Sequence, residues 1–299
     1  MINRKSKKEK KPVARLEGLL DPKVDFVFKN IFGKDKEIFC SFANSVIQPP
    51  PDKLIIDIEF KDKDLHKNDE KDKESRLDVL AILKDKSQIN IEIQLAPQAV
   101  FDKRVLFYWG KIYTSQLQEA QSYSDLQPVI CISLLNFIFD HSHEDVHTKY
   151  VIQNMKRYVR AFHEFEIHFI EIPKFNHKIK TMLDKWINFL LSPAENIADP
   201  TIQKAKNNLN VLSLDENMRV QYESRLKQIR DEHAVRVTAE AKKYHEGFLD
   251  GKSEGETKGI EKGKEEEKKE IAKKLKKLGF SNIDIQKVTG LSIEILKKI

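Results

Sequence analysis

One apolar stretch, residues 129–139, limits most strongly what this chain can fold into. Its sequence, VICISLLNFIF, is interrupted by Ser133 and Asn136. A strand that is apolar on both faces belongs inside a sheet that is covered on both sides. The preceding residues, from about 98 to 123, predict a long helix, and a helix before such a strand indicates a crossover connection. We therefore expect an α/β fold in which helices flank a mixed sheet.

Four other stretches alternate apolar and polar residues, which predicts strands with one buried face. They cover residues 54–60, 76–83, 89–95 and 165–172. The link at 85–88 is short enough to make the second and third of these strands a hairpin. The expected sheet therefore contains at least one antiparallel pair.

Helices are predicted on both sides of the strand region. The first has Asp21 as its N-cap and Pro22 as its first helical residue, and Gly33 ends it. A second, shorter helix ends at the prolines 49–51. Further along the chain, residues 178–245 predict only helices, so we expect a helical extension after the sheet.

The end of the chain has a glycine repeat and then a helical tail. On a helix the repeat would form a stripe of small residues, each costing about 1 kcal/mol relative to Ala. Segment 246–266 is therefore either a flexible, partly helical linker or a helix with a close-packing face. Residues 267–299 predict three helices with helix-turn-helix-like spacing, the last two capped by Ser281 and Ser292. The repeat consists of Gly247, Gly251, Gly255, Gly259 and Gly263.

The net charge of +6 is unevenly distributed. The first eleven residues carry +5 and residues 242–299 carry +4, so the remainder carries −3. Charge alone thus does not make the central part a nucleic-acid-binding domain. Residues 1–15 are Lys-rich with little apolar content, which predicts a disordered basic arm.

Other functional classes find little support. No apolar run is long enough to cross a bilayer, and no secretory signal pattern follows the basic start, so we expect a cytoplasmic protein without a membrane span. Cys40 and Cys131 lie in apolar surroundings without metal-ligand spacing, and we expect both to be buried thiols. No phosphate-binding GxxxxGK motif indicates ATP dependence.

The stretch most informative about chemistry is RLDVLAILKDKSQINIEIQ. If both strands form, Glu92 and Gln94 share a face of the second strand, and the hairpin brings Asp78 close to Glu92. Two carboxylates on an apolar hairpin repel each other unless a cation lies between them. Carboxylate oxygens suit Mg²⁺ or Mn²⁺, which can orient a water and neutralise charge on a phosphate. The pattern D-x14-E-x-Q is therefore a metal-site hypothesis.

Four motifs carry a resemblance to a known family. They are LDPKVDFVFKNIFG, SRLDVLAIL, INIEIQ and RVLFYWGKIYTSQLQEAQSYSDLQPVICISLLNF, within about residues 19–175. Together they resemble the recombination-promoting nuclease family, whose members are often labelled transposases, within the PD-(D/E)xK nuclease superfamily. The glycine repeat and the terminal TGLS turn are similar to that group as well.

The resemblance implies a restriction-endonuclease-like core over residues 16–175 and Mg²⁺-dependent cleavage of DNA, with Mn²⁺ as a substitute. Asp78 and Glu92 would be the metal ligands. Gln94 would take the place of the lysine that holds the water, and Asp25 would be the acidic residue from the first helix. For Asp25 the alternative is a solvated helix residue without a catalytic role.

Gln94 raises a question about the mechanism, because an amide cannot supply the positive charge of a lysine. Arg104 and Lys111, seven residues apart and on nearly one helix face, are the predicted substitutes. The alternative is a basic helix face that contacts phosphate without taking part in the chemistry. The sequence HSHEDVH, residues 141–147, has metal-ligating residue types, but its place after the apolar strand favours a solvent-facing loop.

Two hypotheses about function remain. The first is a bacterial metal-dependent DNA endonuclease linked to recombination or transposition. The second is a catalytically weak DNA-binding or oligomerising protein built on a nuclease-like fold. The carboxylates Asp78 and Glu92 favour the first, and Gln94 favours the second. DNA is the expected partner, and a homo-oligomer could form through the C-terminal helices.

Overall fold

The computed structural model describes residues 18–61, 64–65, 75–76, 78–98, 100–117 and 120–299. The predicted basic arm at 1–15 lies outside this part of the chain. Two compact units, Met1–Arg225 and Leu226–Ile299, divide the protein. The first contains the sheet and its covering helices, and the two units are described separately below.

A six-stranded mixed sheet forms the centre of the first unit, in the order β1-β4-β5-β6-β8-β7. The central strands β5, β6 and β8 are parallel, whereas the remaining pairs are antiparallel. The prediction of a mixed sheet with a hairpin is therefore confirmed. A separate ribbon joins β2 (Asp64–Leu65) and β3 (Ser75–Arg76). The strands of the large sheet are β1 (Ile58–Lys61), β4 (Val79–Leu83), β5 (Gln88–Gln94), β6 (Val129–Leu135), β7 (His147–Asn154) and β8 (Val159–Glu171).

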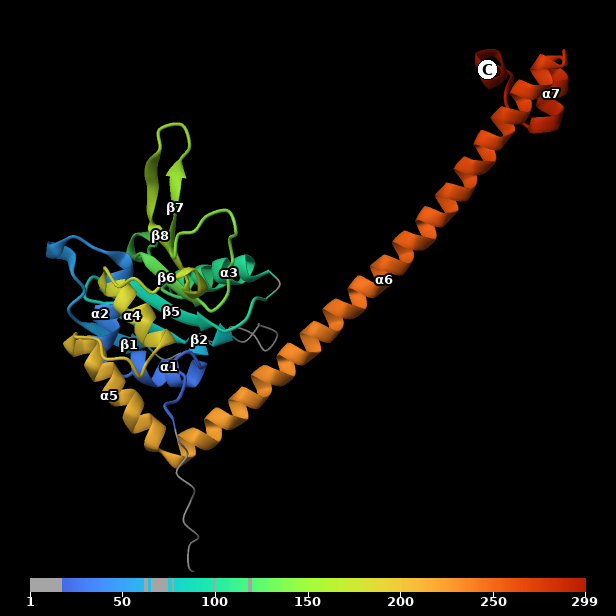
Figure 1. Ribbon diagram of the computed structural model, residues 1–299. Coiled ribbons are helices and arrows are strands. Elements are labelled where there is room, and N and C mark those ends of the chain that lie inside the picture. The colour runs from blue at the N-terminus through green and yellow to red at the C-terminus, as the bar shows by residue number, and fades with distance from the viewer. Residues whose placement is uncertain (1–17, 62–63, 66–74, 77, 99, 118–119) are drawn as a thin grey trace, which may run out of the picture. The chain divides into compact units, whose positions relative to one another are not determined.

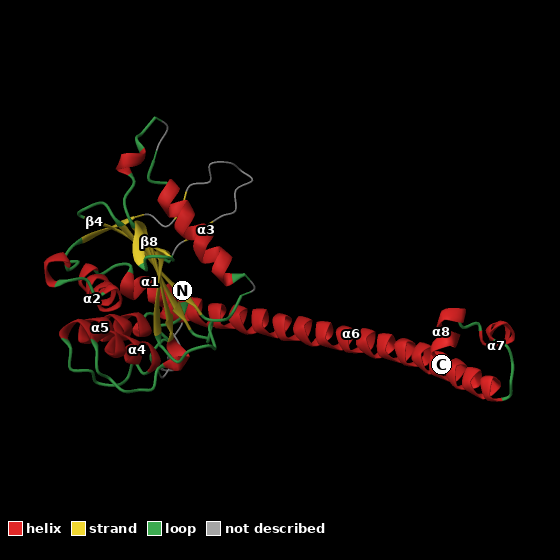
Figure 2. Cartoon of the chain, turned by 90° about the horizontal axis from the view of Figure 1, so that it is seen from above, coloured by secondary structure: helices red, strands yellow, loops and turns green. Residues whose placement is uncertain are grey.

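Helices cover both faces of this sheet, as Figures 1 and 2 show. Helix α3 packs against β6 on one face. Four helices that contact one another lie on the other face, because each buries an apolar stripe there. The bounds are α1 (Asp25–Phe32), α2 (Lys36–Ile47), α3 (Phe101–Thr114), α4 (Met182–Leu191) and α5 (Pro200–Leu214), with three-residue 3-10 helices η1 (Pro51–Lys53), η2 (Tyr123–Asp125) and η3 (Ile172–Lys174).

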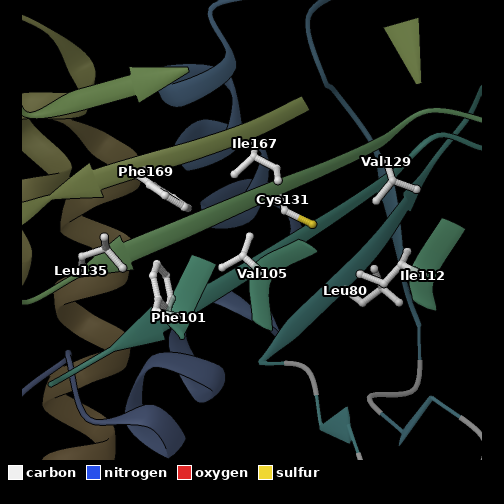
Figure 3. Packing of buried hydrophobic residues seen from close by; sticks show 9 residues of the cluster. All are labelled: Leu80, Phe101, Val105, Ile112, Val129, Cys131, Leu135, Ile167 and Phe169. Carbon is white, nitrogen blue, oxygen red and sulfur yellow. The ribbon is translucent and has the colours of Figure 1, made fainter. Parts of the chain in front are cut away.

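The core between α3 and the sheet consists of apolar side chains from both elements (Figure 3). Cys131 belongs to it, and Cys40 is also buried, so both cysteines are the core thiols expected from the sequence. Aromatic rings extend the core toward β8, where the centroids of Phe101 and Phe169 lie 5.4 Å apart. The cluster comprises Leu80, Phe101, Val105, Ile112, Val129, Cys131, Leu135, Ile167 and Phe169.

Helix α1 begins later than the sequence predicted. It starts at Asp25, because the Asp21 carboxylate accepts the Lys23 N–H at 2.9 Å and closes a turn instead of capping the helix. Gly33 does end the helix. A Cβ at Gly33 would lie 2.7 Å from the Lys29 carbonyl oxygen and 3.3 Å from Val79 Cγ2, so this glycine lets the end of α1 approach β4.

The helix α3 is shorter than predicted, because the chain leaves it at Thr114 rather than near residue 123. The Gln116 side chain exchanges hydrogen bonds of 3.0 Å with the backbone of Gln127, which ties the segment after the helix to the start of β6. The hairpin of β7 and β8 was not predicted in full. Strand β7 is polar and mostly exposed, so it lacks the alternation that marks a half-buried strand.

One helix, α6 (Glu216–Lys277), includes the whole glycine repeat. A Cβ added at any of the five glycines would meet no other atom within 4 Å. In the second unit, α7 (Asn282–Thr289) and α8 (Ile293–Lys298) pack on the end of α6, and the predicted caps Ser281 and Ser292 are confirmed. Their small core is made of Ala272, Ile285, Leu291 and Leu296. Among the described residues, no helix is long and apolar enough to span a membrane.

Candidate active site

The β4–β5 hairpin brings two acidic side chains to the same level of the sheet. Val79 pairs with Ile91 in the antiparallel register, so the next position outward places Asp78 opposite Glu92. The Asp78 Oδ2 atom accepts the backbone N–H of Ile93 at 3.0 Å, which fixes this carboxylate against β5. The predicted proximity of Asp78 and Glu92 is therefore present in the structure.

Glu92 is buried and Asp78 is partly buried, with a side chain 13% exposed, and both charges are incompletely compensated. Glu92 is 5% exposed, and its Oε1 accepts a hydrogen bond of 3.1 Å from Asn90 Nδ2. Burial, followed by repulsion from Asp78, raises the pKa of Glu92 to about 7. Burial also raises the pKa of Asp78, in spite of a neighbouring ammonium group. A pair of this kind favours binding of a cation.

Two cationic side chains lie beside this pair. The Nζ atom of Lys29, in α1, is 3.0 Å from Asp78 Oδ1. Arg104, in α3, is on the side of Glu92, since its charge acts to lower the pKa of that carboxyl. Its Nη1 donates to Gln98 Oε1, while Nε and Nη2 are buried without a hydrogen-bond partner among the described residues.

Aromatic rings surround the guanidinium group. The Arg104 Cζ atom is 5.8 Å from the ring centroids of both Phe101 and Tyr108. Burial and the charge of Glu92 raise the pKa of the Tyr108 hydroxyl, so this hydroxyl is within electrostatic range of the carboxylates. The Arg104 guanidinium group is thus within cation–π range of two rings, with two N–H-bearing atoms available for an anion.

The other predicted site residues lie at different distances from this centre. Asp25 accepts a hydrogen bond of 3.2 Å from Arg225 Nε, and its charge adds to the factors that raise the pKa of Asp78. Gln94 ends β5 and is half-buried on the same face as Glu92. Lys111 Nζ lies 6.0 Å from the Phe107 ring centroid.

The donor set fits a hard divalent cation. The described residues contain no group of three or more His, Cys, Asp or Glu side chains placed to hold a metal. Mg²⁺ does not require one, because it commonly takes one or two protein carboxylates and completes its shell with waters and phosphate oxygens. The mutually repelling carboxylates of Glu92, which is buried, and Asp78, which is partly buried, meet that requirement.

Sequence reasoning missed two polar residues of the site, Lys29 and Asn90. Asn90 could have been found, because the β5 pattern QINIEIQ places polar side chains at every second position on the face that carries Glu92. Lys29 gave no such signal. It is one of many lysines, and only the packing of α1 brings it to Asp78.

The histidine-rich segment does not form a metal cluster among the described residues. Its first histidines lie in a loop, as predicted, while His147 begins β7. The sequence suggests an ordinary strand-flank histidine at His168, and the structure corrects this prediction. His168 is fully buried and lies 2.8 Å from both His147 Nε2 and Glu166 Oε1. The reason is that β7 covers this edge of the sheet.

The mixed six-stranded sheet flanked by helices is consistent with the PD-(D/E)xK class of α/β folds. Within that class, the chain belongs to the PD-(D/E)XK nuclease family transposases, whose family model matches residues 22–239. The comparisons with curated proteins and with solved structures gave no match.

Proposed function

We propose that this protein is a metal-dependent endonuclease that hydrolyses phosphodiester bonds in DNA. The observation that carries the proposal is the pair of buried carboxylates, Asp78 and Glu92, at one level of the β4–β5 hairpin in a member of a nuclease family. A buried acidic pair with raised pKa values is costly to fold, and such groups gather at functional sites.

The surroundings of each site residue support a specific proposed role. Asp78 and Glu92 would hold Mg²⁺ or Mn²⁺, and the bound ion would supply charge neutralisation at the scissile phosphate and an oriented water. Arg104 would bind a phosphate oxygen through Nε and Nη2, which match the paired oxygens of a phosphate. Asp25 would adjust the charge around Asp78, and Lys111 would contact the DNA backbone.

A second candidate function is a DNA-binding or oligomerising protein with a weakened nuclease site. The observation that favours it is Gln94, since a neutral amide stands where the family motif has a lysine. Under either function we expect DNA as the partner and action in the cytoplasm, in recombination or transposition. Assembly through the C-terminal helices would suit staggered cuts on two strands.

Cleavage of supercoiled plasmid tests the first function against the second. The purified full chain is assayed with Mg²⁺, Mn²⁺, Ca²⁺ or EDTA, beside Asp78→Ala and Glu92→Ala. Metal-dependent nicking that both substitutions abolish is the expected result. If all three proteins shift DNA in a gel but none cuts it, the binding function is correct.

Arg104 needs a matched comparison of its own. Arg104→Ala should raise the KM for DNA by at least about tenfold, because a buried phosphate contact of this kind contributes about 1.5–3 kcal/mol. The exposed neighbour Lys103 serves as the control. Lys103→Ala should change KM little, and equal effects of the two substitutions would show that Arg104 acts only through the general charge of α3.

A further inference from the structure

We propose that Lys29, in α1, supplies the positive charge that the family motif would place at position 94, where this chain has Gln94. This inference rests on the proposed nuclease function and names a further residue of the same site. It replaces the expectation that the substitute cation comes from α3, where Arg104 and Lys111 were the predicted candidates.

The contact that carries the inference joins Lys29 to a proposed metal ligand. Its Nζ atom lies 3.0 Å from Asp78 Oδ1, while the other carboxylate oxygen, Oδ2, is held by the Ile93 N–H. The Lys29 side chain is 23% exposed, so the ammonium group is neither fully buried nor free in solvent. An ammonium group has three N–H donors, and Asp78 occupies one, which leaves donors for a water or a phosphate oxygen.

The fold holds Lys29 in this place through α1. Phe28 and Ile31 bury their side chains in the core, which fixes the rotation of the helix. Gly33 lets the end of α1 approach Val79, the residue that follows Asp78, because a Cβ there would lie only 3.3 Å from Val79 Cγ2. Lys29 therefore reaches Asp78 from a helix 49 positions earlier in the chain.

The cations on α3 are suited to other tasks. Arg104 lies on the Glu92 side, where its guanidinium group is within 5.8 Å of the ring centroids of Phe101 and Tyr108 and donates a hydrogen bond to Gln98. That geometry suits a phosphate better than a single water. Lys111 lies over the Phe107 ring, with Nζ 6.0 Å from the ring centroid. Lys29 forms an ion pair with Asp78 at 3.0 Å.

The proposed role of the Lys29 ammonium group is electrostatic. In phosphodiester hydrolysis the oxygen of a water forms a bond to phosphorus, the bond from phosphorus to the leaving oxygen breaks, and the proton lost by the water is balanced by one gained by the leaving oxygen. Lys29 would donate a hydrogen bond to the attacking water as negative charge develops on it. Donors placed in this way typically contribute about 10²–10³-fold in rate.

A matched set of variants tests the inference. Lys29→Met removes the charge but keeps much of the side-chain volume, and Gln94→Lys restores a lysine at the motif position, alone and combined with Lys29→Met. Lys36→Met is the control, since Lys36 forms an ion pair of the same 3.0 Å length with Asp57, with both side chains more than half exposed. Circular dichroism and thermal unfolding verify that each variant folds.

Two measurements are made on each full-length protein: plasmid cleavage at saturating Mg²⁺, and Mn²⁺ affinity by calorimetry. We expect Lys29→Met to lower the cleavage rate by about 10²-fold, and to tighten Mn²⁺ binding several-fold because no ammonium competes for Asp78. The double variant should recover at least about tenfold in rate. Lys36→Met should match the wild type in both assays.

The outcomes separate this inference from the proposed function. If the wild type cuts DNA and Lys29→Met cuts equally well, Lys29 has no role in cleavage and the nuclease function stands. If Lys29→Met weakens Mn²⁺ binding and Gln94→Lys restores nothing, Lys29 only holds Asp78 in place and the inference is wrong. If the wild type does not cut DNA under any metal condition, the nuclease function fails and the inference fails with it.

Discussion

Two buried glutamates on the same sheet show opposite electrostatics. Glu92, on β5, and Glu166, on β8, are each 5% exposed. The pKa of Glu92 is raised to about 7 by burial and by Asp78. Burial alone would also raise the pKa of Glu166, but hydrogen bonds from His168 and Lys149 outweigh it and lower that pKa to about 2.

The difference lies in the partners rather than in the depth of burial. Glu166 has Lys149 at 2.8 Å, Arg160 at 2.9 Å and His168 at 2.8 Å. Glu92 has an amide donor, Asn90, and faces a second carboxylate. A buried carboxylate with several hydrogen-bond donors is compatible with a stable fold. An uncompensated buried carboxylate destabilises the fold unless a bound ligand neutralises its charge. The comparison thus separates a structural acid from a candidate functional one.

Two histidines, His147 and His168, lie at the Glu166 site and also distinguish it from the Glu92 site. Burial and the neighbouring His168 lower the pKa of His147 to about 4, and burial lowers the pKa of His168 as well. Their rings stack with centroids 5.0 Å apart. At neutral pH the pair is therefore uncharged, and the positive charge that balances Glu166 comes from Lys149 and Arg160.

The largest expected effect is on catalysis. Glu92→Gln should reduce the rate of plasmid cleavage by about 10³-fold, or about 4 kcal/mol in activation free energy, because it removes a proposed metal ligand. Glu166→Gln should leave the cleavage rate per folded molecule within about twofold of the wild-type rate. Cleavage kinetics at saturating Mg²⁺ measure both, and an equal loss in the two variants would remove the distinction between the two sites.

The effects on stability should be reversed, so that substitution of Glu166 destabilises the fold more than substitution of Glu92. Glu166→Ala should lower the free energy of unfolding by about 3 kcal/mol, since it leaves the Lys149 and Arg160 charges without their buried partner. In the absence of metal at pH 8, Glu92→Gln should not destabilise the fold, because it removes the repulsion with Asp78. Urea unfolding followed by circular dichroism measures both changes. A stable Glu166→Ala variant would contradict the structural role.

Metal should stabilise the fold through one site alone. Ca²⁺ or Mn²⁺ at about one hundred times its Kd should raise the free energy of unfolding of the wild type by about 2.7 kcal/mol. That gain should disappear in Glu92→Gln and persist in Glu166→Gln. Thermal unfolding with and without metal measures the gain, and stabilisation that survives Glu92→Gln would place the metal elsewhere.

The smallest expected effect is the pH dependence of the free energy of unfolding of the metal-free protein. Because the pKa of Glu92 is about 7 in the folded chain and near 4.5 when unfolded, the native state binds more protons between these values. The contribution of Glu92 to stability is therefore present below about pH 4.5 and is lost as the pH rises through about 7.

Comparison with Glu92→Gln isolates this contribution, since other titrating groups are common to both proteins. Wild type should lose about 2 kcal/mol relative to the variant between pH 5 and pH 7. Urea unfolding at several pH values in EDTA measures the difference. A difference independent of pH would mean that Glu92 is ionised throughout this range.

The sequence by itself determined the features that depend on local patterns. The alternation in QINIEIQ fixed β5 and the face of Glu92, because side chains repeat every two residues in a strand. The short link after β4 made a hairpin, which set Asp78 opposite Glu92. Ser281 and Ser292 capped their helices through contacts within three residues. Such rules act over a few residues, so they can be read from the chain.

Only the tertiary structure decided how charges meet across long separations. The contact of Lys29 with Asp78 depends on the packing of α1 against the sheet. The compensation of Glu166 depends on β7, a polar strand without a pattern of its own. Burial and partner charges set a pKa, and both belong to the assembled fold rather than to any short segment of sequence. The sequence therefore identifies the acidic residues, and the fold separates the structural acid from the one available to a metal.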